Sequence, residues 1–305
     1  MDDFWVQLIP NLISLQTNVK KINCFSFWDK KENRNFFDFN PSSEFDFKYF
    51  VKSEVPDVPK EIEFRFSNFI FSKGKWYFKR KVGTLDLSFV IDEINHIVIA
   101  NKLCHNLFVK VSWIEPIGYI LSDYINYQIE KKGISYHDGA AAAIKGRTFL
   151  IFGFGKNFKT TLVNMILRDG GYYIGEEFFL LNNDRVYATI PNSHRFDFRE
   201  SHKQLMKINL REKKCDSSIY DAAIFLIFSN KDEVVELDFD QANSYAEVFH
   251  QYIANSFFYS FLKAKDFLEK RRVMEKRNLL LNKKARFFII YFTDVKNALK
   301  FISEY

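Results

Sequence analysis

Short apolar segments that alternate with polar residues dominate the first hundred positions of the chain. Between Glu61 and Ala100, turn residues separate these segments, with Gly74 and Gly83 at two of the breaks. A period of two is typical of strands with one buried face, so the pattern predicts an antiparallel sheet here. Before it we expect loops around one short helix, near Phe4 to Leu15. Residues 1–112 are therefore predicted to form a β-rich N-terminal domain.

A helical spacing of apolar residues appears further along the chain. One predicted helix has Ser122 in the place of an N-cap and ends before Gly133, a typical C-terminal stop. A hairpin of two apolar strands then leads into a glycine-containing loop, and helical spacing returns from Lys159 to Gly171. Further apolar strands and a long helix from Gln241 to Leu268 follow. Residues 113–305 are therefore predicted to form a domain of mixed α/β class.

The segment "GFGKNFKTT" directly follows an apolar strand and opens a helix. It is similar to the phosphate-loop pattern GxxxxGK[ST], in which backbone N–H groups at a helix N-terminus surround a phosphate, a lysine reaches the β/γ-phosphates and a hydroxyl joins Mg²⁺. Three of the four fixed positions match, so the segment predicts nucleotide binding. The candidate nucleotide-binding residues are Gly153, Gly155, Lys156, Asn157, Phe158, Lys159, Thr160 and Thr161.

Phe158 stands where the pattern has its second glycine. A glycine there permits close approach of the backbone to the phosphates, or a φ angle that a bulky residue resists. Gly155 and Lys156 could compensate, because they supply flexibility and a second positive charge. On the loop alone, a chance match remains an open interpretation.

The segment from His137 to Leu181 resembles the HPr kinase/phosphorylase family and its wider relatives. In that family a histidine opens a strand of small residues, a hairpin leads into the phosphate loop, and an acidic pair follows a short strand. His137 stands in the place of that histidine, and Glu176 and Glu177 follow Lys159 by 17 and 18 residues, where the family has two aspartates. The resemblance implies an HPr-kinase/PEP-carboxykinase-like nucleotide-binding domain behind the β-rich N-terminal domain.

What the resemblance implies about function is an ATP- and Mg²⁺-dependent kinase that phosphorylates a hydroxyl of a peptide, a sugar or another small metabolite. Glu176 would be the general base, assisted by His137, and Lys159 would contact the β/γ-phosphates. Thr160 and Glu177 would hold the magnesium ion. The division of roles agrees with the general chemistry of phosphoryl transfer. Many members of the family are oligomeric, so the resemblance also allows this chain to form a homo-oligomer.

Two other functional interpretations stay open. Glutamate in place of aspartate moves each carboxylate outward by about 1 Å, and a shift of that size can reduce a rate about 100-fold. Phe158 in place of the loop glycine is a second departure from the family pattern. The second hypothesis is therefore a catalytically degenerate nucleotide-binding or regulatory protein of the same fold. A third is nucleic-acid binding by the segment from Lys263 to Arg286, which has ten Lys/Arg against three Asp/Glu. We rank it below the other two, because such a run is more often a solvated face.

Composition narrows the remaining choices. The net charge of +6 suits anionic ligands without requiring nucleic acid. Cys24, Cys104 and Cys215 are far apart and form no CxxC motif, so neither a disulfide framework nor a zinc site is indicated. The acidic start is unlike a signal peptide, and no apolar run reaches the roughly 18 residues that a membrane span needs. The sequence thus predicts a cytoplasmic protein without a transmembrane segment.

Overall fold

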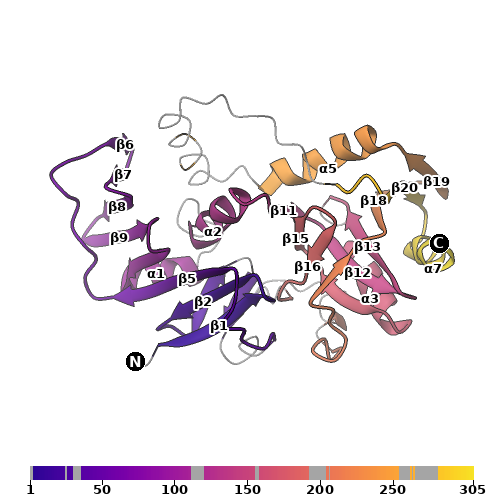
Figure 1. The fold of residues 1–305 in the computed structure, drawn as a ribbon, viewed down its shortest axis with the longest axis horizontal. Coiled ribbons are helices and arrows are strands. Elements are labelled where there is room, and N and C mark those ends of the chain that lie inside the picture. Colours follow the sequence, from indigo (N-terminus) through magenta and orange to yellow (C-terminus); the bar gives the residue numbers. More distant parts are fainter. Residues whose placement is uncertain are drawn as a thin grey trace. The chain divides into compact units, whose positions relative to one another are not determined.

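The chain forms two compact units with separate β-sheets (Figure 1). The computed structural model describes residues 3–24, 26–29, 36–110, 120–154, 158–191, 204–205, 207–253, 262, 264 and 281–305. One unit comprises Met1–Tyr127 with Ser256–Glu275, and the other comprises Gln128–Asn255 with Lys276–Tyr305. The mixture of several sheets with helices confirms the predicted mixed α/β class.

The first unit is built on an eight-stranded mixed sheet in the order β1-β2-β5-β10-β9-β8-β7-β6. The run from β6 to β10 is antiparallel, as predicted, whereas β5 lies parallel to both β2 and β10. A separate hairpin joins β3 to β4. The strands are β1 (Phe4–Ile9), β2 (Ile13–Thr17), β3 (Lys21–Cys24), β4 (Ser26–Asp29), β5 (Phe45–Lys52), β6 (Phe64–Phe66), β7 (Phe69–Ser72), β8 (Lys75–Val82), β9 (Leu85–Asp92) and β10 (Ile97–Asn101).

The helix expected near Phe4 to Leu15 is wrong, because this segment forms the antiparallel hairpin of β1 and β2. Asn11 turns the chain with a φ of 58°, a left-handed conformation that asparagine tolerates better than most residues. The Leu12 N–H donates to the Ile9 carbonyl at 3.1 Å and closes the turn. A proline at position 10 also disfavours a continuous helix through this segment.

Two helices follow the sheet of the first unit along the chain. Helix α1 (Lys102–Lys110), which the sequence did not predict, contacts β9 and β10. Helix α2 (Ile120–Glu130) begins two residues before the expected N-cap, so Ser122 lies inside the helix. Its predicted stop is confirmed, since Gly133 has a φ of 82° and donates its N–H to the Glu130 carbonyl at 3.0 Å.

The second unit contains a six-stranded sheet in the order β14-β12-β13-β18-β20-β19. The neighbouring strands β13, β18 and β20 are parallel to one another. β12 and β19 pair antiparallel with β13 and β20, and the edge strand β14 pairs antiparallel with β12. A second, four-stranded sheet has the order β11-β15-β16-β17. The strands are β11 (Ser135–Asp138), β12 (Ala140–Ile144), β13 (Arg147–Phe152), β14 (Tyr172–Gly175), β15 (Phe178–Asn182), β16 (Arg185–Tyr187), β17 (Ser217–Ile219), β18 (Ala222–Phe228), β19 (Glu233–Leu237) and β20 (Arg286–Phe292).

Helices cover both faces of the six-stranded sheet (Figure 1). Helix α3 (Lys159–Arg168), which the sequence predicted, contacts α7 (Val295–Glu304), while α5 (Phe239–Ile253) contacts β11. On β13, Phe149 meets Tyr305 beside α7 and Phe152 meets Phe249 of α5, with ring centroids 5.7 and 5.4 Å apart. Because the two phenylalanines are three positions apart on one strand, an odd number, their rings lie on opposite faces of the sheet. Helix α5 begins the long helix predicted from Gln241 to Leu268, most of whose remainder lies outside the described residues.

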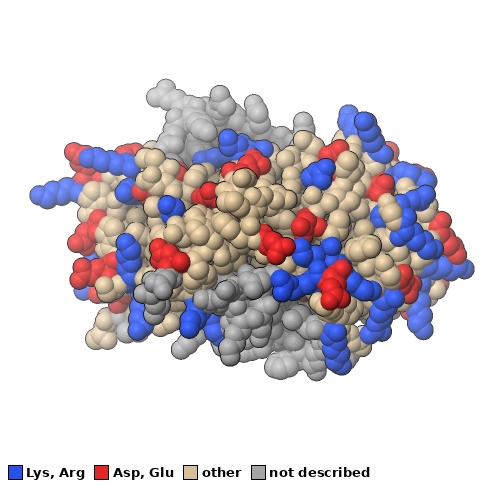
Figure 2. Space-filling model, turned by 60° about the horizontal axis from the view of Figure 1, so that its bottom comes forward, with Lys and Arg blue, Asp and Glu red and all other residues tan. Residues whose placement is uncertain are grey.

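Two observations on the described residues concern their helices and their cysteines. None of their helices is long and apolar enough to cross a membrane. The thiols of Cys104 and Cys215 are free. Basic and acidic side chains are interspersed over the face shown in Figure 2, in keeping with the modest net charge of the chain.

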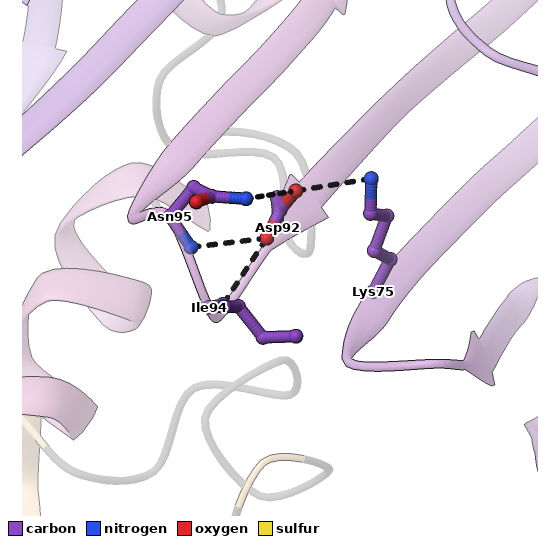
Figure 3. Close-up of polar contacts among 4 residues, drawn as sticks. All are labelled: Lys75, Asp92, Ile94 and Asn95. Atoms are coloured by element: carbon purple, nitrogen blue, oxygen red, sulfur yellow. Dashed lines mark hydrogen bonds and ion pairs between the residues drawn. The ribbon is translucent and has the colours of Figure 1, made fainter.

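A buried carboxylate organises the turn between β9 and β10 (Figure 3). Asp92 accepts hydrogen bonds from the backbone N–H groups of Ile94 and Asn95, both at 3.1 Å. Its other oxygen accepts from Asn95 Nδ2 and lies near Lys75 Nζ on β8, each at 3.0 Å. Burial raises the pKa of Asp92, but the hydrogen bonds from Asn95 and Lys75 lower it by more, so the pKa lies below its ordinary value of 3.8.

Replacing this carboxylate should destabilise the first unit in a pH-dependent way. We expect Asp92→Asn to lower the free energy of unfolding at pH 7 by about 1.5–3 kcal/mol, the range for hydrogen bonds to a charged group. Since the folded pKa is depressed, the contribution of Asp92 is complete above the unfolded pKa and is lost as the pH falls through the folded value. Urea titrations between pH 7 and pH 3 should therefore show the two proteins converging in acid.

Asp57→Asn is the matched control, because the Asp57 side chain is 91% exposed and pairs with Lys79 at 3.4 Å. Its effect should stay below about 1 kcal/mol, as for other exposed ion pairs. Two results would contradict a stabilising role of the ionised Asp92 carboxylate. One is an equal loss of unfolding free energy in the two variants, and the other is a loss in Asp92→Asn that does not shrink in acid.

Candidate phosphate-binding site

The junction between β13 and α3 has the strand–loop–helix order of a phosphate-binding loop. Gly153 follows the last residue of β13 and is buried, and α3 begins at Lys159. The predicted ligands Gly155, Lys156 and Asn157 lie outside the described residues. Free N–H groups in the first turn of a helix attract anions, so the described part of the junction suits a phosphate.

Phe158 adopts the conformation in which a glycine would be expected. Its φ of 61° and ψ of 13° are left-handed, and its carbonyl accepts the Leu162 N–H at 2.9 Å, which starts the helix. A non-glycine residue in this region costs about 1–2 kcal/mol. Ring contacts offset part of this cost, since the Phe158 centroid lies 5.7 Å from that of Phe228 and 6.0 Å from that of Phe292. The backbone turn that glycine would supply is thus formed without it.

Lys159 turns its side chain back toward the end of β13. Its ammonium group donates a hydrogen bond to the Gly153 carbonyl and lies 3.5 Å from Asp138 Oδ1. The Lys159 and Asp138 side chains retain only 10% and 23% of their exposure, so this ion pair is shielded from water. The structure therefore places the lysine ammonium group beside the carboxyl ends of β13 and β11.

Asp138 is a site residue that the sequence analysis did not identify. It ends β11, beside His137 and before Gly139, and contacts a lysine 21 positions later in the chain. Burial raises its pKa, while the charge and hydrogen bond of Lys159 act in the opposite direction. An acidic residue immediately before an apolar strand was the only signal in the sequence, and it did not indicate a partner.

The two threonines lie in the first turn of α3. Thr160 is buried and Thr161 is half-buried. Their N–H groups belong to the helix end that lacks intrahelical acceptors. The Thr160 hydroxyl is the loop oxygen that the pattern assigns to a magnesium ion.

Glu176 and Glu177 form the turn between β14 and β15. Glu176 is buried and Glu177 is half-buried. The Glu177 carbonyl accepts the Gly139 N–H at 3.0 Å, which joins this turn to the strand end that carries Asp138. Burial raises the pKa of the Tyr173 phenol well above its ordinary value, and the negative charge of Glu176 raises it further.

His137 is fully buried on β11, where it pairs with Phe179 of β15. Its Nε2 lies 2.8 Å from the Ser135 hydroxyl, and its ring stacks on that of Phe179 with the centroids 5.6 Å apart. The His137 ring also lies perpendicular to that of Phe152, with the centroids 6.0 Å apart. These contacts suit a hydrogen-bonded structural histidine, and its catalytic role stays a prediction.

The oxygen groups assigned to the magnesium ion are of the chemical kind that a hard divalent cation takes in the company of a nucleotide. Mg²⁺ at nucleotide sites takes one or two protein ligands and completes its shell with phosphate oxygens and water. The Thr160 hydroxyl and the Glu177 carboxylate are donors of the right kind. Among the described residues no group of three or more His, Cys, Asp and Glu side chains gathers into a metal site.

The chain matches no protein-family model, and no curated protein shows significant similarity to it. The resemblance to the HPr kinase/phosphorylase family therefore depends on the motif residues between His137 and Leu181. Most of the basic segment from Lys263 to Arg286 lies outside the described residues, so the structure adds no argument for nucleic-acid binding.

The left-handed backbone at position 158 can be measured through stability. We expect Phe158→Gly to be more stable to unfolding than Phe158→Ala by about 1 kcal/mol, because glycine adopts this φ without steric cost. Both variants lose the same ring contacts. The difference between their free energies of unfolding in urea therefore measures the cost of the left-handed backbone at position 158.

The same pair of substitutions at Lys300 provides the control. Lys300 is exposed within α7, and there alanine should be more stable than glycine by about 1 kcal/mol. A Phe158→Ala protein as stable as Phe158→Gly would show that position 158 is not left-handed in solution.

Proposed function

We propose that the second unit binds ATP with Mg²⁺ at the junction of β13 and α3 and transfers its γ-phosphoryl group to a hydroxyl. The observation that carries the proposal is the placement of Lys159, which folds over the Gly153 carbonyl at the N-terminus of α3. The left-handed Phe158 supports it, since the loop keeps its turn despite the missing glycine. The acceptor would be a hydroxyl of a peptide, a sugar or another small metabolite.

The proposed chemistry assigns a role to each side chain around the loop. Lys159 exchanges the Asp138 carboxylate for the β- and γ-phosphates, and the helix N–H groups bind the same oxygens. Thr160 and Glu177 would hold Mg²⁺, which neutralises phosphate charge when it is bound.

The transfer step needs a base that takes one proton. The acceptor oxygen forms a bond to the γ-phosphorus as the bond from that phosphorus to the bridging oxygen breaks, and ADP leaves. Glu176 takes the hydroxyl proton, with His137 as its proposed partner. Because Glu176 is buried, it would be shielded from bulk water while it does so.

A nucleotide-binding protein without turnover is the alternative. The contact that favours it is the ion pair of Lys159 with Asp138, since a lysine that stays with the carboxylate does not stabilise the charge of the γ-phosphate during transfer. ATP binding without phosphate release would identify this second function.

Substitutions on the two sides of the ion pair should change ATP affinity in opposite directions. We expect Lys159→Ala to weaken ATP binding about 10- to 100-fold, because it removes a charged hydrogen-bond donor to the phosphates. Asp138→Asn should strengthen ATP binding several-fold, since the lysine no longer has a competing anion. Calorimetric titration with ATP, with and without Mg²⁺, measures both.

Both variants break the same ion pair, so each serves as the control for the other. Any loss of affinity that comes only from a weakened fold should appear in both. Unchanged affinity in Lys159→Ala, or a parallel fall in the two variants, would exclude the loop as the phosphate site.

Glu176→Gln tests the transfer step separately from binding. With water as the acceptor, we expect phosphate release from labelled ATP to fall about 100-fold or more, the usual contribution of a general base. ATP affinity should change little, because the assigned role of Glu176 lies with the acceptor. Glu212→Gln, at an exposed carboxylate of the same unit, should leave both quantities unchanged. Full phosphate release by Glu176→Gln would remove this residue from the mechanism.

A further inference from the structure

Exposed aromatic side chains gather beside the phosphate loop. Phe158 is 41% exposed and Phe228 is 57% exposed, although their ring centroids lie only 5.7 Å apart. Phe292 is fully buried and contacts both rings, at 6.0 and 5.8 Å. A buried ring thus supports two rings that keep much of their surface open to solvent.

The sheet topology places this aromatic cluster at the edge where ligands bind. β18 and β20 are parallel to β13, and Phe228 pairs with Phe292 at their carboxyl ends. Helix α3, which follows β13, contacts α7, whereas α5, which follows β18 and β19, packs on the opposite face. In open α/β sheets, ligands bind outside the carboxyl ends of adjacent strands whose connections lie on opposite faces.

The chemistry of the cluster favours a nucleobase over other occupants. Phe158 immediately precedes Lys159, so these rings are within reach of a ligand whose phosphates the lysine holds. Aromatic rings stack on the π-face of a base. Ser229 and Asn230 follow Phe228, and the exposed Asn230 amide carries both a donor and an acceptor for a base edge.

We propose that Phe158 and Phe228 form the stacking surface for the purine base of the bound nucleotide. The inference rests on the proposed function, because the phosphate loop must first hold the phosphates. It gives a role to the one departure from the loop pattern, since the phenylalanine that replaces the glycine supplies part of the base site.

Titrations with ATP and with inorganic tripolyphosphate, both with Mg²⁺, separate the base from the phosphates. The wild-type protein should bind ATP more tightly than tripolyphosphate. Phe228→Ala should weaken ATP binding about five- to 100-fold, the range for loss of one stacked aromatic, and leave tripolyphosphate affinity unchanged. Phe228→Leu, which keeps apolar volume, should still lose most of the preference for ATP.

Tyr172→Ala is the matched control, because Tyr172 is an aromatic residue of the same unit with 52% exposure, on β14 at the far edge of the sheet. It should leave both affinities unchanged. Equal wild-type affinities for the two ligands, together with no effect of Phe228→Ala, would overturn the base site while the phosphate site stands. Binding of neither ligand would overturn both.

A second copy of this chain is another possible occupant of the aromatic cluster, and sedimentation would detect it. If Phe228→Ala abolished self-association in sedimentation but changed neither affinity, the rings would form an interface between copies of this chain. That outcome would also overturn the base site.

Discussion

The left-handed backbone of Phe158 is the constraint on which the candidate site depends. At a φ of 61°, this residue ends the loop from β13 and aligns the first turn of α3. The following residue, Lys159, can then reach back to the Gly153 carbonyl. A glycine would form the same turn at lower steric cost, but it would have no ring to pack on Phe228 and Phe292. Strain in the backbone and packing of the side chain are therefore linked at one position.

The parallel strands of the second unit bring the other parts of the site to the same edge. Asp221 fixes their relative register at the opposite end, because its carboxylate accepts the Thr148 N–H at 2.7 Å and its carbonyl accepts the Arg286 N–H at 3.0 Å. With the register fixed there, β18 and β20 end level with each other at Phe228 and Phe292, three positions beyond the pair of Phe152 with Phe225. Gly153, Phe228 and Phe292 consequently lie at the carboxyl ends of neighbouring strands, although they are far apart in the sequence.

The sequence predicted correctly those elements that are specified by residues close together in the chain. The hairpin of β12 and β13, the helix from Lys159 and the stop at Gly133 were correct because turn residues and apolar spacing specify them over a few positions. The hairpin near Asn11 was mistaken for a helix because its apolar residues do not alternate strictly with polar ones. Helix α7 was missed although Asp294 accepts the Lys296 N–H as an N-cap would.

Asp138 could not be predicted in the same way, because its role depends on a contact between two elements. The sequence indicates a lysine at a helix start and an acid at a strand end, but not that the strand end lies within 3.5 Å of the lysine. Once they are paired, each charge makes burial of the other less costly. A largely buried lysine that is to bind phosphate needs a counter-charge before the phosphate arrives, and the same carboxylate must be weak enough to be displaced. The strength of this one ion pair therefore distinguishes a loop that exchanges nucleotide from a fold that has kept the loop without its activity.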